Sequence, residues 1–220
     1  MDKKMLRKFF PVILLIFAMA VGFTGATVLH SLTLENPIKT PTTDGGITEE
    51  LDNNAKKVSF TNNGEADVFL RVACTETWIL ESNGEGEDII LPNQAIAKDG
   101  QSVSVAKPVW QGITDGSWTL GSDGWYYYNK ILPGSKSGEK NRNTGLLVND
   151  VNFNLDEIED ERYQKAKYQL HFTMEVVQAS DDIEVSEAAV EKLFNKELDL
   201  SGAWGEEGKY GYSISWPTTE

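Results

Sequence analysis

The sequence predicts a mostly β protein: an antiparallel, jelly-roll-like β-sandwich with one short helix, at about residues 185–196, near the C-terminus. Many short segments alternate apolar and polar residues with a period of two, which is typical of half-buried strands. Gly, Asn and Asp clusters separate these segments and predict turns. Helical spacing of apolar residues stands out only in the C-terminal segment. Short strands with one helix favour a sandwich.

The first thirty residues are predicted to be a signal peptide or a membrane anchor. Four basic residues come first: Lys3, Lys4, Arg7 and Lys8. An uncharged run of 21 residues follows, from Phe9 to Leu29, which is long enough to span a bilayer. We expect cleavage after Ala26, because Thr24 and Ala26 are small residues at the −3 and −1 positions. Ala20 offers a second such site, and a retained anchor is the alternative.

Residues 31–55 are predicted to be an extended N-terminal segment, and residues 56–220 a single β-sandwich domain. Leu32 and Leu34 alternate with polar residues, and Pro37 then prevents further strand pairing. Such a short strand is able to complete its own sheet or to dock on the sheet edge of a neighbouring copy. The alternative is a plain tether between membrane and domain.

Charge and cysteine content restrict the partners and the location. The chain has a net charge of −14, and without the first thirty residues it has 33 acids and 16 bases, a net charge of −17. This charge argues against nucleic-acid or anionic-lipid partners. A single cysteine permits no internal disulfide, which for an exported domain indicates a Gram-positive surface. We therefore expect a secreted or cell-surface protein that meets the membrane only through its leader.

The first predicted hairpin joins a strand at Val58–Phe60 to a strand at Val68–Cys74. The letters NNGE at 62–65 between them indicate a turn. The alternation places Val68, Leu70 and Val72 inward. Cys74 has the same phase, so we interpret it as a small buried residue and not as a reactive thiol.

Five further elements are predicted along the chain. They are a short strand at 89–91, a hairpin of 117–120 with 125–128, a strand at 146–153, a strand at 167–177 and a final strand at 210–216. In the strand at 167–177, Leu170, Phe172 and Met174 share one face. The helix is predicted to start at Ser186 as its cap, with Ala189, Val190, Leu193 and Phe194 in one stripe.

Residues 56–72 read KKVSFTNNGEADVFLRV, residues 123–134 read DGWYYYNKILPG and residues 176–179 read VVQA. In these stretches the chain resembles the TasA/camelysin-like exported proteins of Gram-positive bacteria, which use a SipW-like signal peptidase. The resemblance covers about residues 56–216. It implies an exported jelly-roll-like domain and, as in the best-known members, a fibre subunit of the biofilm matrix.

The sequence contains no pattern typical of a catalytic or metal site. His30 and His171 are the only histidines, and no His-Glu-x-x-His is present. The acidic runs, such as Asp156–Glu161, match no EF-hand loop and are interpreted as solvated loops. We therefore predict a non-enzymatic protein without metal or cofactor.

Trp110, Trp118 and Trp125 are the candidate glycan-contacting residues, because flat exposed rings stack on sugars. Aromatic residues in strands are more often core, so packing is the favoured interpretation. The predicted function is an exported surface or extracellular-matrix protein, with a fibre subunit as its specific form. Its partners are then copies of itself or other matrix and cell-wall components. The alternative is a carbohydrate-binding module.

Overall fold

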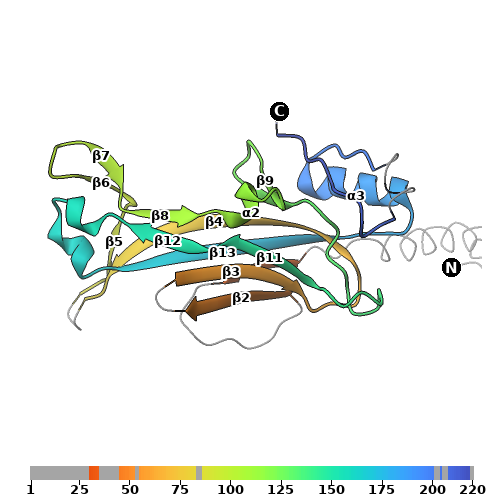
Figure 1. The fold of residues 1–220 in the computed structure, drawn as a ribbon, viewed down its shortest axis with the longest axis horizontal. Helices are drawn as coiled ribbons and strands as arrows, with labels where there is room; N and C mark the ends of the chain where they lie inside the picture. The colour runs from red at the N-terminus through yellow and green to blue at the C-terminus, as the bar shows by residue number, and fades with distance from the viewer. Residues whose placement is uncertain are drawn as a thin grey trace, which may run out of the picture.

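The computed structural model describes residues 30–34, 45–52, 55–82, 86–200, 204 and 208–218, and residues 1–29 of the predicted leader lie outside these ranges. Antiparallel sheets pack face to face, and one long helix lies at the end of the molecule that carries the C-terminus (Figure 1). The fold class predicted from the sequence is therefore confirmed as a mostly β, antiparallel sandwich with a helix near the C-terminus.

The larger sheet has six strands in the order β1-β13-β4-β10-β9, with β5 paired to the far end of β4. Its strands are β1 (His30–Leu34), β4 (Val68–Leu80), β5 (Ile89–Leu91), β9 (Trp118–Leu120), β10 (Tyr126–Tyr128) and β13 (Lys167–Gln178). The longest pairing joins β4 to β13, from Val68 opposite Gln178 to Ile79 opposite Lys167. These two strands form the centre of the six-stranded sheet.

Smaller sheets accompany the six-stranded sheet. One has the order β11-β3-β2, with β2 (Gly45–Asp52), β3 (Ala55–Asn62) and β11 (Asn143–Val148). The others pair β12 (Asp150–Phe153) with β8 (Ala106–Val109), and β6 (Gln94–Ile96) with β7 (Ser102–Ser104). The helical elements are α2 (Gln111–Thr114), η2 (Leu155–Glu157), η3 (Glu161–Gln164) and α3 (Ile183–Phe194).

Two hydrophobic clusters lie on opposite faces of the six-stranded sheet. The first fills the sandwich, and its largest members are Phe60, Leu70, Trp78, Trp118, Leu147, Leu170 and Phe172. The second lies under α3 and the C-terminal segment, and includes Phe69, Tyr127, Val177, Val190, Phe194, Trp204, Ile214 and Trp216. Phe69 and Leu70 are adjacent on β4 and both fully buried, so this end of the sheet is covered on both faces.

The predicted hairpin between β3 and β4 is wrong, although both strands exist. β3 pairs with β2 and β11, whereas β4 pairs with β13, β10 and β5 in the other sheet. Residues 63–67 therefore turn a corner between sheets. The Asn62 side chain holds this corner, because its Nδ2 donates to the carbonyls of Ala66 and Leu132 and its Oδ1 accepts from Gly64 N–H. The inward placement of Val68, Leu70 and Val72 is confirmed by their burial.

Several other predicted elements are confirmed, and three need correction. The strand at 89–91, the β9–β10 hairpin and β13 with its apolar face are present. The predicted strand at 146–153 is divided between β11 and β12. The predicted strand at 210–216 does not pair as a strand: one backbone hydrogen bond joins Ile214 N to the Asn129 carbonyl, and Trp216 Nε1 donates to the Tyr128 carbonyl.

The third correction concerns the cap of α3, which begins at Ile183 with Asp182 as its N-cap. The Asp182 carboxylate accepts from the N–H groups of Glu184 and Val185. Ser186 lies inside the helix and is fully buried, where its Oγ bonds the backbone of Ser180. The buried stripe of Ala189, Val190 and Phe194 agrees with the prediction.

Candidate functional site

The edge strand β1 lies in the region predicted to be an extended N-terminal segment. It pairs antiparallel with β13, with Leu32 opposite Met174 and Leu34 opposite Phe172. Both partners on β13 belong to the cluster inside the sandwich. Within the described ranges, no strand pairs with the other edge of β1. The strand therefore completes the sheet of its own chain and occupies its border.

The three candidate glycan-contacting tryptophans do not share a surface. Trp118 is 2% exposed and belongs to the core of the sandwich, so it offers no face to a ligand. Trp110 is half-buried and stacks on Tyr126, with 4.4 Å between ring centroids and 19° between planes. Trp125 packs against the second cluster, on the opposite face of the sheet. These three rings therefore form no common platform, and among them Trp110 alone is stacked on another ring of the described chain, that of Tyr126.

One edge of β4 is incompletely paired. β10 pairs with it at Arg71 and Val72, and β5 pairs with it from Trp78 to Leu80. Between these contacts, at residues 73–77, no strand of the described chain borders β4 on that side. Cys74 and Glu76, which have the same phase as the buried Val72, are half-buried at this gap.

Glu76 is the centre of a polar cluster near this gap. Its Oε2 accepts from Asn93 Nδ2 at 2.5 Å and from the Tyr168 hydroxyl at 2.9 Å. Asn93 Oδ1 also accepts from Trp78 Nε1 at 3.1 Å. Burial, with the bond to Glu76, raises the pKa of Tyr168. The Glu76 carboxylate is thus held in a fixed orientation by neutral donors.

Asn93 also covers the edge of β8. Its Oδ1 accepts from Ala106 N–H at 2.8 Å, and its Nδ2 donates to the Ala106 carbonyl at 2.9 Å. The side-chain amide therefore takes the place of a neighbouring strand at this residue. Pro108 follows on the same strand and has no N–H to offer. Together they leave β8 a poor template for further pairing.

Cys74 sits beside this cluster and is the single cysteine of the chain. Burial raises the pKa of its thiol to about 12, with a further contribution from the charge of Glu76. A thiol with such a pKa is almost entirely protonated at neutral pH and is a weak nucleophile. Cys74 packs against the cluster inside the sandwich as expected, but it is half-buried and not fully buried.

A second polar network fixes α3 to the sheet. Arg71 donates from Nη1 to the Phe194 carbonyl, at the C-terminal end of α3, at 2.9 Å. The same guanidinium bonds Glu175 and lies 4.3 Å from the ring centroid of Trp125 and 4.5 Å from that of Phe194. The positive charge thus meets the negative end of the helix dipole.

Asp123 and Lys196 extend this network. The Tyr127 hydroxyl donates to Asp123 Oδ2 at 2.7 Å, and Lys196 Nζ lies 3.3 Å from the same oxygen. Burial alone would raise the pKa of Asp123, but the bonds from Tyr127, Trp125 N–H and Lys196 outweigh it and the pKa is lowered. The lysine is 8% exposed, so this pair is part of the structure that holds residues 195–196 on the sheet.

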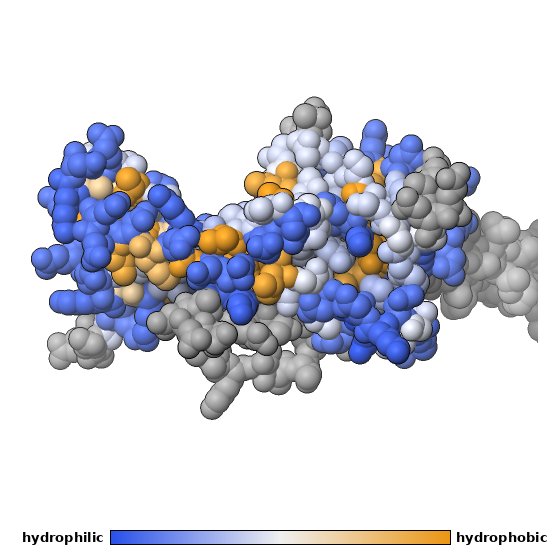
Figure 2. Space-filling model, viewed as in Figure 1, coloured by the Kyte–Doolittle hydropathy of each residue, from blue (hydrophilic) through white to orange (hydrophobic). Residues whose placement is uncertain are grey.

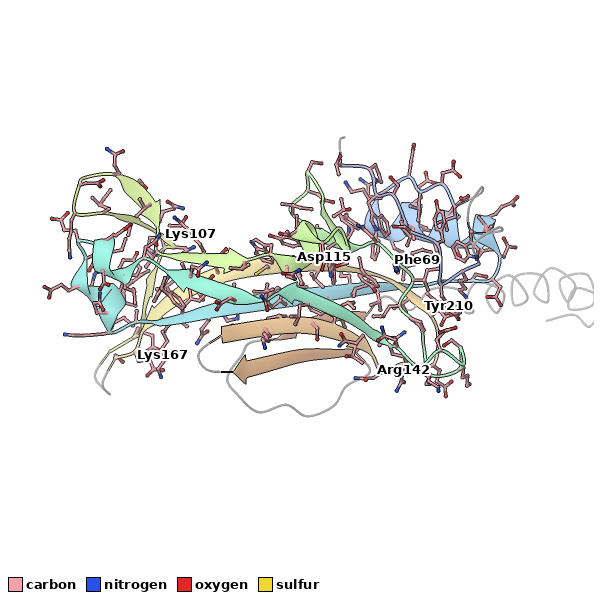
Figure 3. All side chains as sticks on the ribbon, viewed as in Figure 1. Phe69, Lys107, Asp115, Arg142, Lys167 and Tyr210 are labelled. Atoms are coloured by element: carbon pink, nitrogen blue, oxygen red, sulfur yellow. The ribbon has the colours of Figure 1, made fainter. Side chains whose placement is uncertain are left out.

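A third network, around Asp67, fixes the C-terminal segment near Phe69 and Tyr210 (Figure 3). Asp67 Oδ1 accepts from Gly134 N–H at 2.8 Å, while Oδ2 accepts from the Tyr210 hydroxyl at 2.8 Å and contacts Lys209 Nζ at 2.9 Å. Lys209 also pairs with Asp181. The pKa of Asp67 is lowered: burial opposes the ionised form, but these donors outweigh it.

The sequence did not single out Arg71, Asn93 or Asp67 as network residues. The pattern that could have identified them is a charged or amide residue next to an apolar run, as in the letters DVFLRV at 67–72. His171 Nε2 lies 3.1 Å from Thr77 Oγ1. His30 is in β1.

Across the described ranges, no group of three or more His, Cys, Asp or Glu side chains is placed to hold a metal ion. No helix in this part of the chain is both long and apolar enough to cross a bilayer. Comparisons with protein-family models, with curated proteins and with solved structures gave no match.

Proposed function

We propose that the protein is an exported, non-enzymatic structural protein of the cell surface or extracellular matrix that assembles with copies of itself. The observation that carries this proposal is the position of β1. It is a five-residue strand at the border of the main sheet, held there by one neighbour, β13. A border strand of this length can be replaced by the same strand of another copy without changing the rest of the sheet.

The resemblance of residues 56–72 and 123–134 to TasA/camelysin-like proteins supports the same proposal. In this proposal the predicted leader directs the chain to a Gram-positive surface, and β1 is the first element after it. Exchange of β1 between copies then links subunits through backbone hydrogen bonds, with Leu32 and Leu34 of one copy opposite Met174 and Phe172 of the next.

The test compares the mature chain, starting at Thr27, with a variant that lacks residues 31–36. Electron microscopy of the mature chain is expected to reveal filaments, and the variant is expected to stay monomeric while keeping a cooperative melting transition. Filaments formed equally well by the variant would contradict the role of β1. A mature chain that remains monomeric at all concentrations would contradict self-assembly itself.

A second measurement tests exchange directly. A synthetic peptide of residues 27–36 should bind the variant and raise its melting temperature, because it restores the border strand. A matched peptide with Leu32→Asp and Leu34→Asp should not bind, since its charges would face apolar residues of β13. Equal binding of both peptides would show that the apolar contacts do not select this strand.

A further inference from the structure

The upper border of the molecule has a hollow between two raised parts. Figure 2 shows it between the lobe that carries β6 and β7 and the lobe that carries α2 and β9. Figure 1 places β8 along its floor with β4 behind, and Figure 3 places Lys107 of β8 at its β6–β7 end. We call this hollow the saddle; it is open from front to back, so a chain can cross it without inserting an end.

The saddle carries a preorganised pair of aromatic rings. Trp110 joins β8, the strand of the floor, to α2, which belongs to one of the two walls, and it stacks on Tyr126 of β10. Because the two rings are stacked and half-buried, their orientation is fixed before any ligand arrives. Leu120, the register partner of Tyr126, is 47% exposed, and Ile113 on α2 is also exposed. Flat rings bordered by aliphatic groups fit the apolar faces of sugar rings.

Fixed polar groups lie on the same face of the sheet as Tyr126. Glu76 has the same phase on β4 as Val72, the register partner of Tyr126, and its carboxylate is held by Asn93 and Tyr168. A carboxylate oriented in advance accepts hydrogen bonds from hydroxyl groups strongly. Lys107, exposed on the floor, supplies donors at the other end. An aromatic ledge with a few oriented polar groups is the usual composition of a small-molecule or oligosaccharide site.

A peptide strand fits the saddle less well. β8 is blocked by the Asn93 amide at Ala106 and by Pro108. The free stretch of β4 covers residues 73–77 only. In an antiparallel ladder, alternate residues direct their N–H and C=O groups to one side of the strand. A bound peptide would therefore gain hydrogen bonds from roughly two or three residues of this stretch. Charge also restricts the ligand, because Glu76 and the net charge of −14 repel acidic molecules.

We propose that the saddle binds an internal section of an uncharged glycan chain, with a sugar ring against Trp110 and hydroxyl groups on Glu76. This site uses no residue of β1, so it is separate from self-assembly. It gives a surface or matrix protein a direct contact with polysaccharide.

The test is calorimetric titration of the mature chain with a hexamer of N-acetylglucosamine and with cellohexaose, and with oligogalacturonate as the acidic control. At least one uncharged hexamer is expected to bind, and the acidic one is not. Trp110→Ala should weaken binding about tenfold or more, whereas Trp110→Phe, which keeps a flat ring, should retain part of it. Trp125→Ala, on the opposite face of the sheet, is the matched control and should leave the affinity unchanged.

A second readout needs no variant. The bound hexamer should protect one tryptophan of the wild-type chain, identified as Trp110 by mass spectrometry, from oxidation by N-bromosuccinimide. The proposal is overturned if no uncharged hexamer binds at millimolar concentration, if Trp110→Ala binds as the wild type does, or if protection falls elsewhere. Displacement of the sugar by the peptide of residues 27–36 would instead make the saddle a peptide site and also overturn it.

Discussion

Arg71 and Glu175 face each other across β4 and β13, and the guanidinium donates two hydrogen bonds to a single carboxylate oxygen, Glu175 Oε2. The distances are 2.8 Å from Nε and 2.6 Å from Nη2. Both side chains are largely shielded from solvent. Because the same guanidinium also bonds the end of α3 at the Phe194 carbonyl, this pair joins β4 to β13 and α3, two consecutive elements that are distant from β4 in sequence.

Arg71→Ala is expected to lower the free energy of unfolding by about 3 kcal/mol, because it leaves the shielded Glu175 carboxylate and the Phe194 carbonyl without their donor. Urea unfolding measures this loss. The matched control is Lys136→Ala, since the ion pair of Lys136 with Glu65 is solvent-exposed and should contribute less than about 1 kcal/mol. Similar small losses for both variants would contradict a structural role for Arg71.

Leu70→Ala is expected to cost about 2–5 kcal/mol of unfolding free energy, because Leu70 is fully buried inside the sandwich and the substitution leaves a cavity. Ile90→Ala is the control from the same sheet: Ile90 is 70% exposed, so its truncation should change stability little. A loss under about 0.5 kcal/mol for Leu70→Ala would overturn the inward placement of this side chain.

Acid should weaken the attachment of the C-terminal segment through Asp67. Its pKa is lowered below the ordinary 3.8, so its stabilising contribution is present above about pH 4 and is lost as the pH falls through the folded-state value. Asp67→Asn should therefore reduce stability at pH 7 and make the acid side of the stability profile flatter. Urea unfolding at a series of pH values from 7 to 2.5 measures both effects, and a profile parallel to that of the wild type would contradict them.

Cys74 is expected to react slowly with a soluble maleimide in the native protein at pH 7.5. Burial raises the pKa of its thiol to about 12, so almost no thiolate is present at that pH. Reaction should become fast and stoichiometric in urea, where the thiol regains its ordinary pKa. Fast labelling of the folded chain, followed by mass spectrometry, would show that the thiol is accessible and activated.

The strands with long alternation were predictable because burial on one face leaves a period of two in the sequence. Leu170, Phe172 and Met174 of β13 are the clearest example. The partner of a strand was not predictable in the same way. The turn letters at Asn62–Glu65 are equally compatible with a hairpin and with a corner between two sheets. The structure has the corner, with Phe60 packed against Phe172 across the sandwich.

The polar networks could not be predicted from the sequence for a related reason. Arg71 and Glu175 are 104 positions apart, and Asn93 meets Glu76 and Ala106 only after three segments have folded. The aromatic residues gave a mixed result. Their enrichment predicted a sheet with aromatic packing, but the separation of Trp118 from Trp125 onto opposite faces depends on the register of β9 and β10.

The pairing of β1 with β13 has a mechanical consequence. The two strands run antiparallel, from His30 opposite Val176 to Leu34 opposite Phe172. A pulling force applied at His30 along the strand axis loads all the hydrogen bonds of β1 together, in shear. A force applied sideways opens them one after another, like a zipper. The border strand is therefore strong against tension along its own axis and weak against peeling. The direction of the load thus decides whether β1 stays paired with β13.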